Sequence, residues 1–285
     1  MKFRNVKVPE GINVSRHSPL VDLVLLSGGV LAIAGLLGLA VVLFGGTLAR
    51  NMPLSWENAL ADAVFQTGAE ALEDPEPEAT RALQSLADRL AAEMDLPEGL
   101  AITVHYLDDP GVNAFASLGG HVFVLRGLIE RMPSENALAM VMAHEIAHAA
   151  HRDAIGAMGG ALLLQLALGV VLGAAPDGLE DLVMGPNALL LLAFGREAER
   201  AADRAGLAAV AGAYGHVAGA ARIFELFLEE AAAQGQGEPL AILGTHPLGR
   251  ERIAALAALA EAEGWPLDGE AMPLAPALAR LAEAP

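Results

Sequence analysis

The sequence contains no cysteine. A disulfide framework is therefore excluded, and any metal ion must be bound by histidine, aspartate or glutamate side chains. Basic residues are also scarce, because 17 Lys and Arg stand against 35 Asp and Glu, which gives a formal net charge of -18. We expect no nucleic acid as a partner, since neutralising its phosphates needs a basic face that this composition does not supply.

A second absence is local, because no charged residue lies between Asp22 and Arg50. The apolar run from Leu23 to Ala49 exceeds the roughly 20 residues that cross a bilayer. A cleaved signal peptide is the alternative, but its apolar part is usually about 7–15 residues, and Thr47-Leu48-Ala49 matches its cleavage site poorly. We therefore predict an uncleaved transmembrane anchor at residues 20–49 and a lipid bilayer as a partner.

The charges that flank this run predict its orientation. Four basic residues precede it: Lys2, Arg4, Lys7 and Arg16. Only Arg50 closely follows it, among acidic residues. Because flanking cations stay in the cytoplasm, residues 1–19 are expected to form a cytoplasmic tail of a protein in the cytoplasmic (inner) membrane. The rest of the chain then lies outside the cytoplasm, in a periplasm if the cell has one.

The strongest chemical signal is the segment His144-Glu145-Ile146-Ala147-His148. Ser134 can cap a helix that runs from Glu135 to Arg152 without Pro or Gly. On this helix the two histidines lie one turn apart on one face, so both can bind one Zn²⁺ ion. Glu145 then lies beside the open position of the metal, where a carboxylate can take a proton from water. The spacing predicts a hydrolytic metal site, and two surface histidines on an ordinary helix are the alternative.

Zinc catalysis needs a third protein ligand. His151 shares the helix face, but the positions i, i+4 and i+7 span about 10 Å, which is too far for one ion. Glu199 and Asp203 are i, i+4 neighbours, so one helix can present Glu199 to the metal and Asp203 to a metal-bound imidazole. The alternative is a solvated acidic face that is balanced by neighbouring arginines.

Taken together, these motifs resemble those of the membrane-associated gluzincins, which include CAAX prenyl endopeptidases, HtpX and periplasmic BepA-type proteases. The resemblance covers about Ile102 to Ile253 and includes two motifs before the zinc helix, Asn113-Ala114-Phe115-Ala116 and Gly119-Gly120-His121-Val122-Phe123-Val124. One departure is Phe194-Gly195, where these families often have Tyr-Ser.

The resemblance implies one catalytic Zn²⁺ ion as the cofactor. By motif, His144, His148 and Glu199 would be the zinc ligands, Glu145 the catalytic base and Asp203 the partner of a ligand. The implied activity is that of a zinc-dependent endopeptidase acting on misfolded or unassembled membrane or envelope proteins. A non-proteolytic zinc-binding scaffold or chaperone-like adaptor is the alternative, although such a site has no use for Glu145.

A further histidine, His246, lies in Gly244-Thr245-His246-Pro247. It can be an exposed residue before a capped helix. BepA-type relatives carry a similar segment, whose histidine can approach the metal. By this resemblance His246 either fills the fourth zinc position and closes the site, or hydrogen-bonds the oxyanion of the intermediate.

The predicted fold class is mainly α with a small antiparallel β-sheet, in a zincin-like metalloprotease domain over residues 50–265 followed by a C-terminal tail, 266–285. Strand character is found at residues 101–107, 112–118 and 121–125. By resemblance, residues 113–116 form an edge strand that pairs with the substrate backbone.

An apolar segment at residues 155–195 interrupts the predicted domain. Because His148 precedes it and Glu199 follows it, and both would bind one ion, any membrane crossings between them must be even in number. Gly185-Pro186 breaks the second half, which therefore spans a bilayer poorly. We predict a helical hairpin on the domain or in the outer leaflet, with a pair of spans as the alternative.

Overall fold

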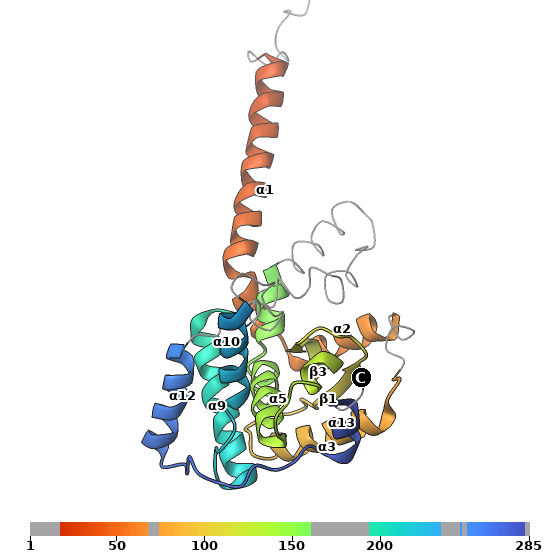
Figure 1. Ribbon diagram of the computed structural model, residues 1–285. Coiled ribbons are helices and arrows are strands. Elements are labelled where there is room, and N and C mark those ends of the chain that lie inside the picture. The colour runs from red at the N-terminus through yellow and green to blue at the C-terminus, as the bar shows by residue number, and fades with distance from the viewer. Residues whose placement is uncertain (1–17, 68–73, 161–193, 235–245, 247–249, 283–285) are drawn as a thin grey trace, which may run out of the picture.

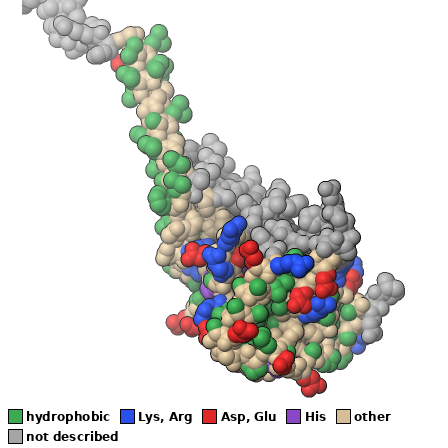
Figure 2. Space-filling view, turned by 60° about the vertical axis from the view of Figure 1, so that its left-hand side comes forward, with side chains coloured by type: hydrophobic (Ala, Val, Ile, Leu, Met, Phe, Trp, Pro, Cys, Tyr) green, Lys and Arg blue, Asp and Glu red, His purple; other side chains and the backbone are tan. Residues whose placement is uncertain are grey.

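A long helix, α1 (Pro19–Arg50), extends away from the other elements in the computed structural model (Figure 1). The structure describes residues 18–67, 74–160, 194–234, 246 and 250–282. Hydrophobic side chains line α1, whereas acidic and basic side chains are spread over the rest of the protein (Figure 2). Within the described residues, α1 is the one helix that is long and apolar enough to cross a membrane, and its apolar window is fully exposed. It is therefore not a core helix of the domain.

Helix α5 (Glu135–Ala150) forms the centre of the domain. Ser134 caps it, because the Ser134 hydroxyl accepts a hydrogen bond from the backbone N–H of Ala137 at 3.3 Å. All residues from 136 to 149 are buried, which is the pattern of a helix surrounded by other elements. The helix predicted from the sequence is thus present, although it ends two residues earlier than expected because Arg152 adopts a positive φ of 56°.

Helix α9 (Arg196–Tyr214) packs directly against α5. The contact is close at Gly206, where a Cβ atom would lie 3.0 Å from the backbone nitrogen of His144. Because glycine lets the two backbones approach, the first turns of α9 are held beside the histidines of α5.

The sheet lies on the other side of α5 and contains β1 (Thr103–Leu107), β2 (Ala114–Ala116) and β3 (His121–Leu125). Its order is β1-β3-β2. Strand β2 pairs antiparallel with β3, and the short helix η2 (Leu118–Gly120) connects the two strands. The prediction of an antiparallel sheet is wrong for β1, which pairs parallel with β3. Strand β1 lies on the far side of β3 from β2, and Ala116 of β2 contacts Glu145 of α5.

The remaining helices cover this centre. They are α2 (Leu54–Thr67), α3 (Pro77–Ala91), α4 (Arg126–Ile129), α10 (Arg222–Gln234), α12 (Arg250–Glu263) and α13 (Pro276–Ala282). The apolar faces of all of them except α2 join one large core, and the mainly helical α+β class predicted from the sequence is confirmed.

A second, smaller core connects α1 to the domain. It contains Ala49 of α1, Phe65 of α2 and Phe123 of β3, together with Ile155 and Met158 from a helical segment at residues 153–160. The end of α1 is therefore packed into the domain rather than attached by a free linker. Most of the predicted apolar hairpin, residues 161–193, lies outside the described residues.

The segment predicted as a C-terminal tail lies against the domain. The carbonyl of Pro266 accepts a hydrogen bond from the backbone N–H of Val217 at 2.9 Å, and Leu278 of α13 is 1% exposed. The backbone N–H of Met272 also donates to the Asn136 side chain at 2.7 Å. Residues 266–282 thus cover the start of α5.

Candidate metal centre and active site

Helix α5 presents His144 and His148 to the same point. Both side chains are buried, and their Nε2 atoms are 3.0 Å apart. Two imidazole nitrogens bound to one tetrahedral zinc ion would be about 3.3 Å apart, given Zn–N bonds of about 2.0–2.1 Å. The i, i+4 spacing therefore gives the separation that a shared metal ion requires.

Each histidine has a carboxylate at its other ring nitrogen. Asp203 Oδ1 of α9 is 3.0 Å from His144 Nδ1, and Asp153 Oδ2 is 2.9 Å from His148 Nδ1. Because a carboxylate only accepts hydrogen bonds, both Nδ1 atoms carry a proton in the neutral rings. Two Nε2 lone pairs then face each other at 3.0 Å, an arrangement that a shared cation stabilises. This pairing of carboxylate and histidine is typical of metal ligands.

Glu199 and His246 complete a cluster of four side chains. Glu199 Oε1 lies 2.9 Å from His246 Nδ1 and 3.5 Å from His148 Nε2, and the ligand atoms of all four residues lie within 4.8 Å of one another. Glu199 Oε2 is buried and makes no hydrogen bond to any described residue. Three imidazoles and one carboxylate form a donor set that fits zinc.

The electrostatics of the cluster also favour a cation. Burial lowers the pKa of His148, but Asp153 and Glu199 outweigh it and raise this pKa to about 9. Burial raises the pKa of the Glu199 carboxyl, but its interactions with His144, His148 and His246 hold it far below its usual range. The cluster therefore keeps its carboxylate ionised and attracts positive charge.

Glu145 lies beside this cluster and is 1% exposed. Its Oε2 accepts a hydrogen bond from the backbone N–H of Ala116 at 3.0 Å, and its Oε1 is 3.4 Å from His246 Nε2. Strand β2 thus fixes the carboxylate next to the point that the histidines face. A carboxylate held there can exchange protons with a water molecule at the metal.

Two functional residues were not predicted from the sequence. Asp153 is five residues after His148, outside the i, i+3 and i+4 spacings that place residues on one helix face. Arg252 of α12 binds both carboxylate oxygens of Asp203, at 2.6 and 2.8 Å, and its Nη1 lies 3.2 Å from Glu199 Oε2. The only sequence signal for Arg252 is its position six residues after His246.

Two other residues that the sequence places near the histidines, His151 and Phe194, lie outside the cluster. His151 is exposed and does not belong to the four-residue cluster. Phe194, at the departure from the gluzincin pattern, places its ring 4.2 Å from the ring of His148. An apolar contact therefore covers this histidine.

Comparisons with known proteins agree with this geometry. The model of Peptidase family M48 matches residues 77–260. The mitochondrial metalloendopeptidase OMA1 of Schizosaccharomyces pombe is 35% identical over 153 residues, which are 53% of this chain and 44% of that protein. OMA1 of Arabidopsis thaliana is 29% identical over 216 residues, 74% of this chain and 42% of that protein.

A putative beta-barrel assembly-enhancing protease of Vibrio cholerae is also similar, with 32% identity over 168 residues. The match covers 53% of this chain and 33% of that protein. The chain thus spans less than half the length of each of these three relatives.

Proposed function

The chain belongs to peptidase family M48, and from this membership we propose that it is a zinc-dependent endopeptidase anchored in a membrane by α1. The observation that carries the proposal is the buried cluster of His144, His148, Glu199 and His246 with Glu145 beside it. His144, His148 and Glu199 are the proposed zinc ligands.

Bound zinc would supply a Lewis acid and a water molecule with a pKa near 7. The Glu145 carboxylate, fixed next to the site by Ala116, would accept a proton from the attacking water and pass it to the leaving amine. Asp203 orients His144, and Arg252 holds Asp203 through two hydrogen bonds. A non-catalytic zinc scaffold would have no use for a carboxylate at Glu145 that Ala116 fixes beside the site.

The substrate is proposed to be a protein or peptide that binds along β2. Strand β2 lies at the edge of the sheet, so an extended backbone can add to it beside Glu145. Asn113, just before β2, is fully buried, and both of its amide atoms lack a hydrogen-bond partner among the described residues. By its resemblance to the membrane-associated gluzincins, the chain would act on misfolded or unassembled membrane or envelope proteins.

The proposed location is the cytoplasmic membrane, with the N-terminus inside and the metal site outside. The exposed apolar surface of α1 supports a membrane span, and the basic residues before it support this orientation. Ala49 is 2% exposed in the small core. Cleavage near residue 49 would remove part of that core, which supports an uncleaved anchor.

His246 is proposed as a fourth ligand that closes the metal site in a resting state. Its Nδ1 lies 3.2 Å from His144 Nε2 and 2.9 Å from Glu199 Oε1, within reach of the point where a metal would bind. A substrate or a water molecule would have to replace it before catalysis, since catalytic zinc needs an open position.

Cleavage of unfolded casein by the purified protein in detergent, with zinc and with a chelator, tests the proposed function. We expect cleavage that the chelator abolishes and added zinc restores. Zinc binding without any cleavage, in wild type and in a His246→Ala variant, would favour the non-proteolytic scaffold instead.

A further inference from the structure

The last turn of α1 reaches the metal site through one buried carboxylate. Asp153 is 3% exposed, and each of its two oxygens has a different partner. Its Oδ2 accepts from His148 at 2.9 Å, while its Oδ1 accepts from the Arg50 guanidinium of α1 at 2.9 Å. A continuous series of contacts therefore joins the anchor to a proposed zinc ligand.

The backbone around Asp153 is shaped to make these contacts. Arg152 has a φ of 56°, an uncommon conformation for a residue with a side chain, and it turns the chain at the end of α5. The Arg152 guanidinium donates to the carbonyl oxygens of Arg50 and Met52, at 2.8 and 2.6 Å, and binds Glu57 at 2.7 Å. The positive charge of Arg152 at these carbonyls interacts favourably with the negative, C-terminal end of the α1 helix dipole. The strained turn is thus held in place by the end of α1, the residues after it and α2.

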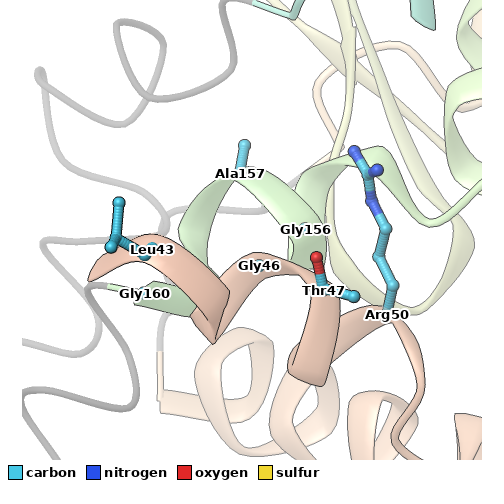
Figure 3. A pocket seen from close by; sticks show the side chains of 7 residues that line it. All are labelled: Leu43, Gly46, Thr47, Arg50, Gly156, Ala157 and Gly160. Carbon is cyan, nitrogen blue, oxygen red and sulfur yellow. The ribbon is translucent and has the colours of Figure 1, made fainter. Parts of the chain in front are cut away.

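Glycines let α1 approach the segment that carries Asp153. A Cβ atom on Gly46 would lie 2.4 Å from the carbonyl oxygen of Gly156, and a Cβ atom on Gly156 would lie 2.1 Å from Arg50 Nε. Figure 3 shows the Arg50 side chain running along the helix turn that contains Gly156. Gly46, Arg50 and Gly156 also line an open pocket of about 260 Å³. Only glycine at position 156 leaves the space through which Arg50 reaches Asp153.

We propose that Asp153 is a positioning residue for His148, and that Arg50 makes the last turn of the membrane anchor a structural part of the metal site. The proposal rests on the proposed function in one respect, namely that His148 is a zinc ligand. Asp153 fixes the ring of His148 and keeps its proton on Nδ1, so that Nε2 is free for the metal. Arg50 holds the carboxylate in the orientation that leaves Oδ2 for His148.

The sign of the Arg50 effect distinguishes positioning from simple charge. Removing a cation near Zn²⁺ would by itself tighten zinc binding, because like charges repel. Weaker zinc binding after loss of Arg50 therefore has the sign opposite to the charge effect, and it indicates lost positioning of Asp153 if the control variant below keeps its affinity.

The experiment measures the zinc dissociation constant of the full chain in detergent, by competition with a fluorescent chelator, and the unfolding temperature of the metal-free protein. We expect Asp153→Asn to weaken zinc binding about 10–100-fold. Arg50→Gln should weaken it by about fivefold, as expected for a partly exposed ion pair. The double variant should bind zinc no more weakly than Asp153→Asn alone.

Arg89→Gln is the matched control. Arg89 is 49% exposed in its ion pair with Glu135 at the other end of α5, and Arg50 is 47% exposed in its pair with Asp153. Arg89→Gln, in α3, removes the same charge from a similarly exposed ion pair but should leave zinc affinity unchanged. An equal loss of affinity in Arg89→Gln would indicate a general loss of stability and would overturn the proposal.

Three further results would also overturn it: unchanged zinc affinity in Asp153→Asn, unchanged or tighter binding in Arg50→Gln, or additive effects in the double variant. If Asp153→Asn does not fold, Arg50→Gln decides the question, because its side chain is half exposed. Failure of the proposed function is seen separately, as wild-type protein that binds zinc but leaves casein intact.

Discussion

Arg252→Met should destabilise the metal-free protein strongly, because it removes the partner of a buried carboxylate. Asp203 and Arg252 are each 10% exposed and form two hydrogen bonds at 2.6 and 2.8 Å. Breaking a buried ion pair by removing one partner costs about 3–5 kcal/mol. For a domain of this size each kcal/mol lowers the unfolding temperature by roughly 2–4 °C, so the expected decrease is roughly 6–20 °C.

Zinc should offset part of this loss, since a cation at His144 compensates the charge of Asp203 through the imidazole. The assay is thermal unfolding in detergent, with saturating zinc and with chelator. Arg280→Met is the control, because Arg280 pairs with Glu78 at the surface, where both side chains are over 60% exposed, and exposed pairs contribute about 0–1 kcal/mol. If the metal-free Arg252→Met protein unfolds at the temperature of Arg280→Met, the role assigned to Arg252 is refuted.

Three other predictions address the site, the sheet and the membrane. His246→Ala should raise basal casein cleavage if His246 closes the site; a ~10²–10³-fold loss would instead assign it to the oxyanion, and unchanged cleavage and zinc affinity would exclude both roles. Burial and the neighbouring His105 lower the pKa of His121 to about 4, below its unfolded value, so stability should fall as the pH decreases from about 6.5 to 4. In urea unfolding, His121→Phe should reduce the loss of unfolding free energy over this pH range by about 1–2 kcal/mol, a value lowered because His121 is partly exposed. A variant with the same pH profile as wild type would contradict this prediction. A reporter enzyme that works only outside the cytoplasm should be active when fused after Pro53, and activity of a cytoplasm-only reporter there would reverse the orientation.

Local spacing accounts for the parts of the site that the sequence could predict. His144 and His148 share a face of α5, and Glu199 and Asp203 share a face of α9, because four residues make about one helical turn. Ser134 marks the start of α5 by an ordinary capping contact. These features follow from short segments, so they need no knowledge of how the elements pack.

Tertiary contacts account for the parts that it could not. Asp153 reaches His148 only because Arg152 adopts a positive φ, and no local pattern marks that turn. Arg252 approaches Asp203 through the packing of α12 against α9. The parallel pairing of β1 with β3 likewise joins two strands that β2 separates in the sequence, so strand patterns alone do not mark it.

The most direct test of the account compares Glu145→Gln with Glu199→Ala in zinc content and casein cleavage. Glu145→Gln should keep about one zinc ion per chain yet lose ~10²–10⁴ in turnover, because only the proton acceptor is removed. Glu199→Ala should lose the metal itself, since it removes one of three proposed protein ligands. Cleavage of casein by Glu145→Gln at the wild-type rate would contradict the proposal that Glu145 is the catalytic base of a zinc endopeptidase.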